Sequence, residues 1–417
     1  MKFFYTGGNN MKKIGKTRLL AAIFALLLLT GCGKQAKIVN MKEFTSQDGT
    51  YSLEADEDYV EADNMGMENW LELESPDKLD TSALAVMQFP KKGGLIGGYS
   101  SLKEVIEFTE ESNNLSGKTK IDAPANTAFD NIEAYIYQVT ENNTEYEICV
   151  VYGETDYAHY MLMYAESKLK PHSDDYFESV CASFQENAEI IEAKMSSDTE
   201  LSDTIRWFNA SNAILIDANR WDYQIYGGLE PNEANQTAAK YVLENSWGVT
   251  DKDSADETLE WLLSEGHRID FTADMEILES AGIVEIDTDE RTDFLLENFD
   301  LSEEDAEYYA RWYGRYEEYG EDAASGWDYN RALSQLANFY LAGYYTLEEA
   351  LDASLLIAET VQASFNSWDD YMESYFIGYE YWSEGDSDAR REIYEKLQNA
   401  SDNPYSVDFN IRLEKSW

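Results

Sequence analysis

The chain has 417 residues and a formal net charge of −51 at pH 7, because 82 Asp and Glu residues outnumber 31 Lys and Arg residues. This acidity excludes a nucleic-acid partner and flat docking on anionic lipid headgroups, since both need a basic surface. Solubility outside the cell accounts for the charge, and attraction of a divalent cation or a basic partner is the alternative. The length suggests about two domains.

Residues 1–31 have the pattern of a signal peptide, whether the chain starts at Met1 or at Met11. Four basic residues come first, namely Lys12, Lys13, Lys16 and Arg18. An apolar run over residues 19–29 follows them. Such a run reaches about 16 Å as a helix, roughly half of a hydrocarbon core, which favours export over a buried helix or a membrane span.

The segment Leu29-Thr30-Gly31-Cys32 ends this run and resembles the lipobox of bacterial lipoproteins. The resemblance implies that Cys32 carries fatty acyl chains, palmitate among them, and becomes the mature N-terminus. Two or more acyl chains would hold the protein stably at the membrane, whereas one would not. We therefore expect an extracytoplasmic protein that is tethered to the cell membrane through Cys32.

Two further cysteines, Cys149 and Cys181, remain for a disulfide in an exported chain. Cys149 lies in a strand-like run and Cys181 in a helix-like run, and a helix packed on a sheet brings such residues together. Two free buried thiols are the alternative, because a free cysteine behaves as a small hydrophobic residue.

Residues 32–190 are expected to form an α+β domain in which helices pack on a mostly antiparallel sheet. Apolar side chains alternate with period two in segments 51–55, 70–74, 83–89, 134–139, 146–152 and 159–164, which predicts strands. The capping box Ser101-Leu-Lys-Glu104 opens one helix, and a second is predicted over 174–184. The "DGTYSLEAD" strand, the middle helix, the long strands and the final Ala182-Ser183-Phe184 are similar to PsbP-like domains. The polar segment 191–202 is predicted to be a linker.

Residues 203–417 are expected to form an all-α domain. Apolar residues spaced by three and four predict helices near 203–218, 232–245, 255–265 and 302–319. A further helix is predicted to begin at Trp327-Asp328 and to end at Gly343.

Two more helices are predicted near the C-terminus of this domain. The capping box Thr346-Leu-Glu-Glu349 opens the first, and Ser367 caps the second. Gly378 lies inside the second helix and has no capping role, which indicates that another helix approaches closely there.

An ordered set of short motifs runs through the helical domain. They are Ser246-Trp-Gly-Val249, Trp261-Leu-Leu, Gly266-His-Arg268, Trp327-Asp-Tyr-Asn-Arg331, Ala342-Gly-Tyr344 with Glu349-Ala350, and Ser367-Trp368 through Tyr371 to Gly378 and Trp382. The set resembles the bacterial domain of unknown function 1266 over roughly residues 203–385. The resemblance implies a helical fold and supplies no activity. The chain departs from it at Glu380 and Tyr381, where an arginine is expected near the glycine.

Two pairs of charged residues are candidates for contact with a ligand. Asp328 and Arg331 lie three residues apart on one helix face. They form an ion pair that pins the helix, or Asp328 orients Arg331 toward an anionic ligand group. His267 and Arg268 follow a predicted helix C-terminus at Gly266. They either cap that helix or serve as a general base or ligand contact.

No motif predicts a cofactor, a metal site or a catalytic group. The three histidines, His159, His172 and His267, lie far apart in the sequence. The segment 251–262 is not an EF-hand, because Asp256 and Leu262 replace the required Gly and Glu. Its acids are expected to cap the next helix, with Ser254-x-x-Glu257 as a capping box.

The anchor, the two-domain layout and the absence of catalytic motifs predict a binding or interaction module of the cell envelope. Its expected partner is another envelope protein or a glycan. The alternative is an extracytoplasmic hydrolase of cell-wall or glycan material that uses acidic residues around His267 and Arg331.

Overall fold

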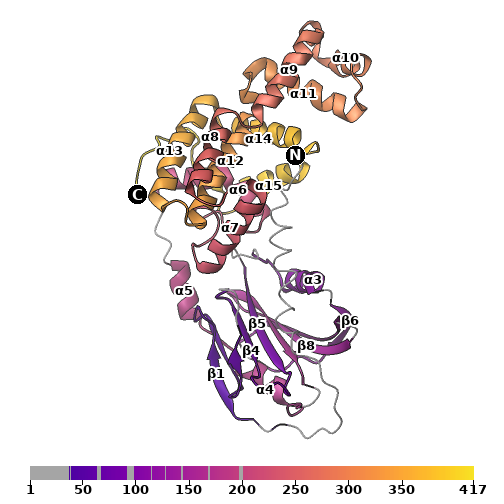
Figure 1. Ribbon diagram of the computed structural model, residues 1–417, viewed down its shortest axis with the longest axis vertical. Helices are drawn as coiled ribbons and strands as arrows, with labels where there is room; N and C mark the ends of the chain where they lie inside the picture. The colour runs from indigo at the N-terminus through magenta and orange to yellow at the C-terminus, as the bar shows by residue number, and fades with distance from the viewer. Residues whose placement is uncertain are drawn as a thin grey trace. The chain divides into compact units, whose positions relative to one another are not determined.

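The computed structural model describes residues 37, 39–62, 67–91, 98–113, 115–126, 128–141, 144–167, 170–196 and 201–417 (Figure 1). The predicted signal peptide and Cys32 lie outside these residues. The chain divides into two compact units. The first comprises residues up to 200 with 219–222 and 232–238, and the second comprises 201–218, 223–231 and 239–417. Among the described residues, no helix has the length and apolar character that a membrane crossing requires.

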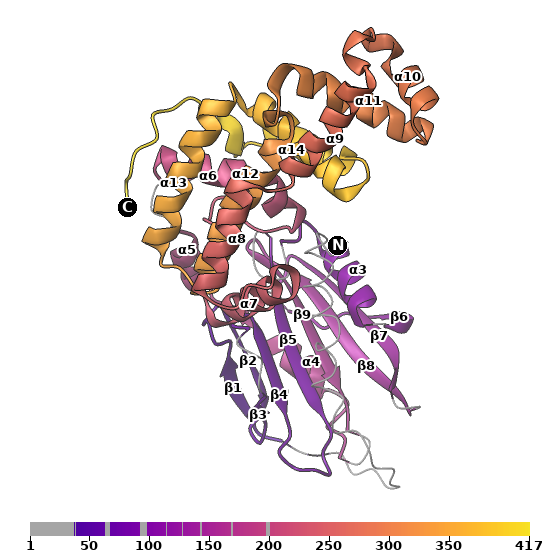
Figure 2. The ribbon, with the colours of Figure 1, turned by 45° about the horizontal axis from the view of Figure 1, so that its top comes forward.

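The first unit is built on antiparallel strands. They are β1 (Met41–Thr45), β2 (Tyr51–Asp56), β3 (Val60–Glu61), β4 (Trp70–Glu74), β5 (Ala83–Pro90), β6 (Ser116–Ile121), β7 (Asn131–Glu141), β8 (Thr144–Glu154), β9 (Ala158–Ala165) and β10 (Gln185–Glu186). A seven-stranded sheet has the order β3-β4-β5-β9-β8-β7-β6 (Figure 2). A three-stranded sheet has the order β1-β2-β10.

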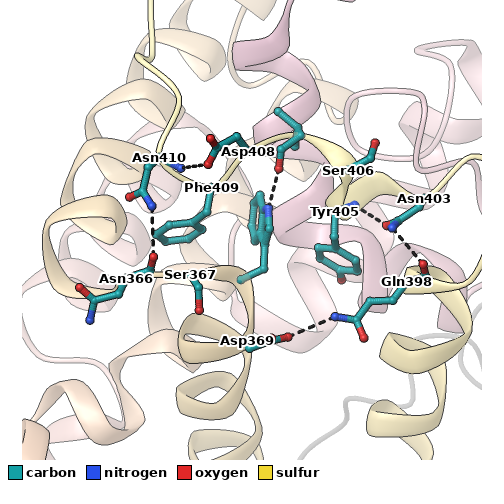
Figure 3. A pocket seen from close by; sticks show the side chains of 12 residues that line it. Asn366, Ser367, Asp369, Gln398, Asn403, Tyr405, Ser406, Asp408, Phe409 and Asn410 are labelled. Carbon is teal, nitrogen blue, oxygen red and sulfur yellow. Dashed lines mark hydrogen bonds between the residues drawn. The ribbon is translucent and has the colours of Figure 1, made fainter.

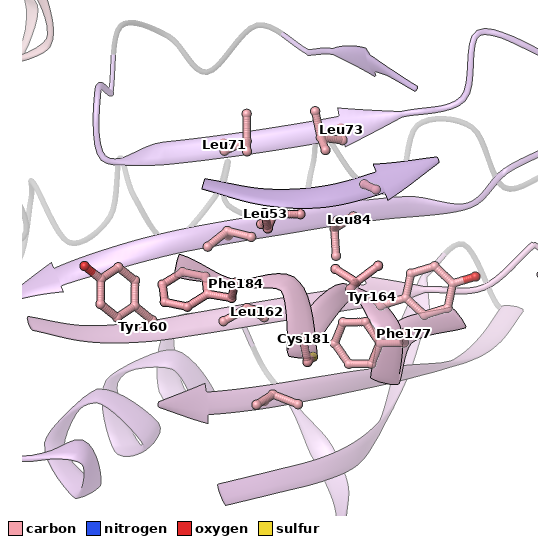
Figure 4. Close-up of a cluster of buried hydrophobic side chains, with 14 of the residues drawn as sticks. Leu53, Leu71, Leu73, Leu84, Tyr160, Leu162, Tyr164, Phe177, Cys181 and Phe184 are labelled. Atoms are coloured by element: carbon pink, nitrogen blue, oxygen red, sulfur yellow. The ribbon is translucent and has the colours of Figure 1, made fainter. Parts of the chain in front are cut away.

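Both faces of the large sheet are covered. Helix α3 (Leu102–Asn113) packs on one face, where Val105 and Ile106 meet Met87 and other strand residues. Helix α4 (Tyr176–Ser183) and the small sheet cover the other face, in a cluster that contains Leu53, Leu84 and Phe177 (Figure 4). Because both faces are covered, every residue of β9 is buried, and its apolar character is nearly continuous.

Cys149 of β8 and Cys181 of α4 belong to this second cluster and are free thiols. The disulfide predicted as one alternative therefore does not form in the structure, which has the two free thiols of the other. Burial raises the pKa of the Cys149 thiol to about 11. Burial, followed by the nearby Cys149, also raises the pKa of Cys181.

The first prediction concerns these two thiols. Since only the thiolate reacts and both pKa values are raised, we expect Ellman's reagent at pH 8 to label neither cysteine in the folded chain from residue 33 onward. Both should react within minutes in denaturant. Stoichiometric labelling of the native protein, or a mass that is lower by two hydrogen atoms before reduction than after it, would contradict the expectation.

Glu72 of β4 is a buried carboxylate with a solvent exposure of 2%. Its Oε2 atom has no hydrogen-bond partner among the described residues. Burial, and to a smaller extent the charge of Glu74, raises the pKa of Glu72 to about 7. The folded protein therefore binds this proton more tightly than the unfolded chain does, and ionisation of Glu72 opposes folding.

The second prediction follows from this sign. Stability should fall as pH rises from the ordinary value of 4.5 to about 7, because the folded state must then release its proton. We expect Glu72→Gln to raise the unfolding free energy by about 1–2 kcal/mol at pH 8 and to change it little at pH 4, since the buried amide keeps part of the burial cost. Urea unfolding at both pH values measures the difference. Equal effects at the two values would disprove it.

Lys37 ties the start of the described chain to the first unit. Its Nζ atom lies 2.5 Å from Oδ2 of the buried Asp56, 3.4 Å from Asp58 and 3.5 Å from Asp80. The backbone N–H of Lys37 donates to the Pro171 carbonyl at 2.8 Å. Burial opposes both charges, but the hydrogen bond between them raises the pKa of Lys37 and lowers that of Asp56.

The second unit is helical, as predicted. Helix α5 (Ala188–Ser196) and the first part of α7 (Glu233–Trp247) cluster with the first unit. The other helices belong to the second unit and are α6 (Asp203–Ala218), α8 (Lys252–Ser264), α9 (Arg268–Ala281), α10 (Arg291–Asn298), α11 (Glu303–Tyr319), α12 (Asp322–Leu341), α13 (Leu347–Ser364), α14 (Trp368–Ser383) and α15 (Asp388–Gln398). Helix α12 is its core and contacts α14, α13, α8, α11, α6 and α9. The predicted α+β and all-α layout is thus confirmed, and α5 occupies part of the predicted linker 191–202.

Several predicted helix ends are confirmed in the second unit. Thr346 and Glu349 form the reciprocal capping box of α13, and Ser367 caps α14. Gly343 follows α12 with a φ of +76°, a left-handed conformation that favours glycine. Two predicted starts are wrong. Helix α12 begins before Trp327, and α8 begins at Lys252, with a capping box between Asp251 and Ser254.

Candidate functional site

The close contact between α12 and α14 fixes the position of the predicted site residues. A Cβ atom on Gly378 of α14 would lie 2.4 Å from Trp327 Cβ and 2.6 Å from the Ala324 carbonyl oxygen. A Cβ on Gly326 of α12 would lie 2.8 Å from Ser374. The predicted close helix approach at Gly378 is therefore confirmed, and it sets Trp327, which lies between Ala324 and Asp328 in the sequence, against α14.

Asp328 is fully buried and accepts hydrogen bonds from the start of α9. The backbone N–H groups of His267 and Arg268 donate to its two oxygens at 2.9 and 3.0 Å. Nδ1 of His267 donates at 3.0 Å, and Nη1 of Arg268 at 3.4 Å. The carboxylate thus neutralises the positive end of α9 and satisfies N–H groups that a helix start leaves without partners.

Arg268 caps the end of the preceding helix. Its Nη1 and Nη2 atoms donate to the carbonyls of Leu262 and Leu263, at 2.9 and 2.6 Å. This confirms the predicted capping of α8 for Arg268. The His267 ring instead donates to the Asp328 carboxylate. Gly266 makes the turn possible with a φ of +64°, and a Cβ there would lie 2.3 Å from Asp328 Oδ2.

The expected ion pair between Asp328 and Arg331 does not form between these two described residues. The α9 start takes the Asp328 carboxylate, and the Arg331 guanidinium lies over indole rings instead. Its Cζ atom is 4.5 Å from the ring of Trp247, 4.7 Å from that of Trp327 and 5.5 Å from that of Trp382. Stacking on aromatic faces is a common environment for a buried guanidinium.

His267 lies between the hydrogen bonds of Asp328 and the indole rings that surround Arg331. Its ring lies 6.4 Å from that of Trp382 and 5.1 Å from that of Trp261. Its side chain keeps 24% of its solvent exposure, whereas Asp328, Arg268 and Arg331 are buried. The structure therefore brings the four predicted residues together, and only His267 among them reaches solvent. The indoles that surround them were part of the family motifs, but their sequence gave no sign of a shared location.

The departure from the family motif has a structural role. Glu380 of α14 is buried and accepts hydrogen bonds from Arg311 Nη2 at 2.5 Å, Trp312 Nε1 at 3.1 Å and Ser387 Oγ at 2.5 Å. It thereby joins α11, α14 and the turn before α15.

A separate groove lies where the chain after α15 passes the start of α14 (Figure 3). It has a volume of about 410 Å³, and its lining residues are Asn366, Ser367, Trp368, Asp369, Gln398, Asn403, Tyr405, Ser406, Val407, Asp408, Phe409 and Asn410. Side-chain amides, carboxylates and aromatic rings dominate this lining. Sequence reasoning missed the groove because residues 399–410 follow no helical or strand period. No group of three or more His, Cys, Asp and Glu side chains in the described ranges could hold a metal ion.

Comparison with known proteins bears on the C-terminal region only. No curated protein matches the chain. A crystal structure from Bacteroides thetaiotaomicron VPI-5482 is similar at 12% identity over 54% of this chain and 78% of that chain, with a TM-score of 0.26, which supports no argument. Residues 242–409 match the model of the family described as "Protein of unknown function (DUF1266)", so the resemblance predicted for the C-terminal region is confirmed there.

Proposed function

We propose that this protein is a lipid-anchored binding module of the cell envelope, with another envelope protein or a glycan as its ligand. The lipobox-like segment 29–32 supports the anchor. The observation that carries the binding role is the burial of Asp328, Arg268 and Arg331 between helices. These charges stabilise the scaffold, whereas the groove beside α14 is a concave polar surface that a ligand could enter.

Lipidation is tested by metabolic labelling with an alkyne fatty acid in a bacterial host. We expect label on the wild-type chain and none on Cys32→Ala. Intact residues 1–31 followed by an unmodified Cys32 thiol in cells would overturn the anchor.

Binding is tested with the chain from residue 33 onward, immobilised and incubated with envelope material from the same bacterium. Retention of a defined protein or glycan supports the proposal. Retention no greater than on an unrelated acidic protein would overturn it.

The hydrogen bond between Asp328 and His267 favours one second candidate, an extracytoplasmic hydrolase of glycan material. A carboxylate that accepts from Nδ1–H orients the imidazole and leaves Nε2 as a general base, here beside the rings of Trp261 and Trp382. His267→Asn keeps an N–H donor near the Nδ1 position and removes Nε2. Loss of glycan hydrolysis without a lower melting temperature would support this candidate, and absence of hydrolysis by the wild type would exclude it.

A further inference from the structure

The groove beside α14 has a negative lining that no Lys, Arg or His side chain of the described residues neutralises. Asp369 and Asp408 line it, and no Lys, Arg or His does. Neither carboxylate forms a salt bridge within the described part of the chain. Arg206 reaches Ser406 at 3.5 Å but is paired with Asp203 at 3.0 Å.

The hydrogen bonds of both carboxylates come from neutral groups. Asp369 Oδ1 accepts from Tyr394 Oη at 2.7 Å and from Gln398 Nε2 at 3.1 Å. Asp408 Oδ1 accepts from the backbone N–H of Asn410 at 2.9 Å. Both residues are exposed, so their charges face solvent and are available to a ligand.

Aromatic rings form the floor of the same groove. The ring of Trp368 lies 5.5 Å from that of Tyr405 and 5.1 Å from that of Phe409. The indole N–H of Trp368 is taken by the Val407 carbonyl at 2.8 Å. The indole N–H is therefore occupied within the protein, and aromatic rings beside carboxylates form an environment that favours organic cations.

A buried hydroxyl in the lining lacks a partner. Tyr405 has a solvent exposure of 8%, and its Oη atom makes no hydrogen bond with any described residue. Figure 3 shows this ring directed toward the side of the groove where Gln398 bridges to Asp369. An unpaired buried hydroxyl costs stability, and a donor from a ligand would remove that cost.

We propose that this groove binds a ligand with a protonated primary amine next to hydroxyl or amide groups. The ammonium group donates to Asp369 and to Tyr405 Oη, with Gln398, an exposed side chain, moving aside. The exposed amide of Asn410 faces the neutral part of the ligand. An amino sugar and a peptide with a lysine-type side chain share this chemistry. The inference rests on the proposed binding role and names its ligand class.

Calorimetric titration of the chain from residue 33 onward tests the inference. The probes are glucosamine, its neutral analogue N-acetylglucosamine, and lysine amide blocked at the α-nitrogen with its ε-acetylated analogue. We expect at least one free amine to bind and its acetylated analogue to bind at least 10-fold more weakly. The amine that binds identifies the source as sugar or peptide.

Matched variants locate the binding. We expect the isosteric changes Asp369→Asn and Asp408→Asn, which keep the shape of the side chain, each to weaken amine binding about 10-fold. Tyr405→Phe should weaken amine binding without lowering the melting temperature. Asp253→Asn changes an exposed carboxylate on α8, outside the groove, and should have no effect.

Three results would overturn the inference, namely no binding of either amine to the wild type, equal binding of the acetylated analogues, or unchanged binding by both Asp variants. Retention of envelope material despite such a result would leave the proposed function standing. Amine binding without retention of envelope material would overturn the proposed function and leave the amine site standing.

Discussion

Replacing Asp328 by alanine is expected to lower the unfolding free energy of the second unit by about 3–5 kcal/mol. The carboxylate is fully buried and accepts from two backbone N–H groups, from the His267 ring and from Arg268. Its removal leaves these donors, one of them charged, without their acceptor in the interior. Urea unfolding followed by circular dichroism at 222 nm measures the loss.

Two companion variants define what the Asp328 carboxylate contributes. Asp328→Asn retains one acceptor oxygen and loses the charge, so its effect should fall between wild type and alanine. Asp253→Ala removes an exposed carboxylate of α8 and should change stability by less than about 1 kcal/mol. A loss for Asp328→Ala as small as that of Asp253→Ala would show that the buried network does not hold α8, α9 and α12 together.

Gly378→Ala should destabilise the same unit by about 3 kcal/mol, at the upper end for overpacking. Its new methyl group would lie 2.4 Å from Trp327 Cβ and 2.6 Å from the Ala324 carbonyl oxygen, so neither neighbour can yield by a simple side-chain rotation. Helices α12 and α14 must therefore separate. The same unfolding assay applies.

Gly314→Ala is the matched control, because Gly314 also lies inside a helix. A Cβ there would meet only Arg291 Nη1, at 3.8 Å. Without a clash, alanine should stabilise α11 by about 0.5–1 kcal/mol through its higher helix propensity. The two Gly→Ala changes should thus have opposite signs. A gain from both would mean that α12 and α14 can adjust to the added methyl.

Elements with strong local signals were predicted well from the sequence. The six period-two segments all lie in strands, and Thr346, Ser367 and Gly343 mark helix ends through side-chain caps or a left-handed residue. These signals are local, because a cap or a turn is fixed by residues within a few positions of one another.

Weaker or misleading patterns explain the elements that were missed. Helix α9 buries Phe271, Met275 and Leu278 but exposes Ile269 and Ile277, so its apolar stripe does not stand out. The first turn and a half of α12 consists of small residues, which carry no apolar period. They are small because α14 lies against them, as the contacts of Gly326 and Gly378 show.

The sequence predicted which residues belong to the candidate site but not which of them interact. Spacing placed Asp328 and Arg331 on one face, yet spacing cannot show that the α9 start, about sixty residues earlier, competes for the carboxylate. Similarly, the groove joins the start of α14 to residues 398–410, and only tertiary structure brings these segments together.

The attachment of Lys37 has a consequence for the proposed lipoprotein. Five residue steps separate Lys37 from Cys32, and they reach about 18 Å even when fully extended. A linker this short cannot act as a flexible spacer between the membrane and the first unit. The edge of the first unit that carries Asp56, Asp80 and Pro171, where Lys37 is attached, would face the bilayer. The lipid anchor would thus set the orientation of the first unit as well as its location at the membrane.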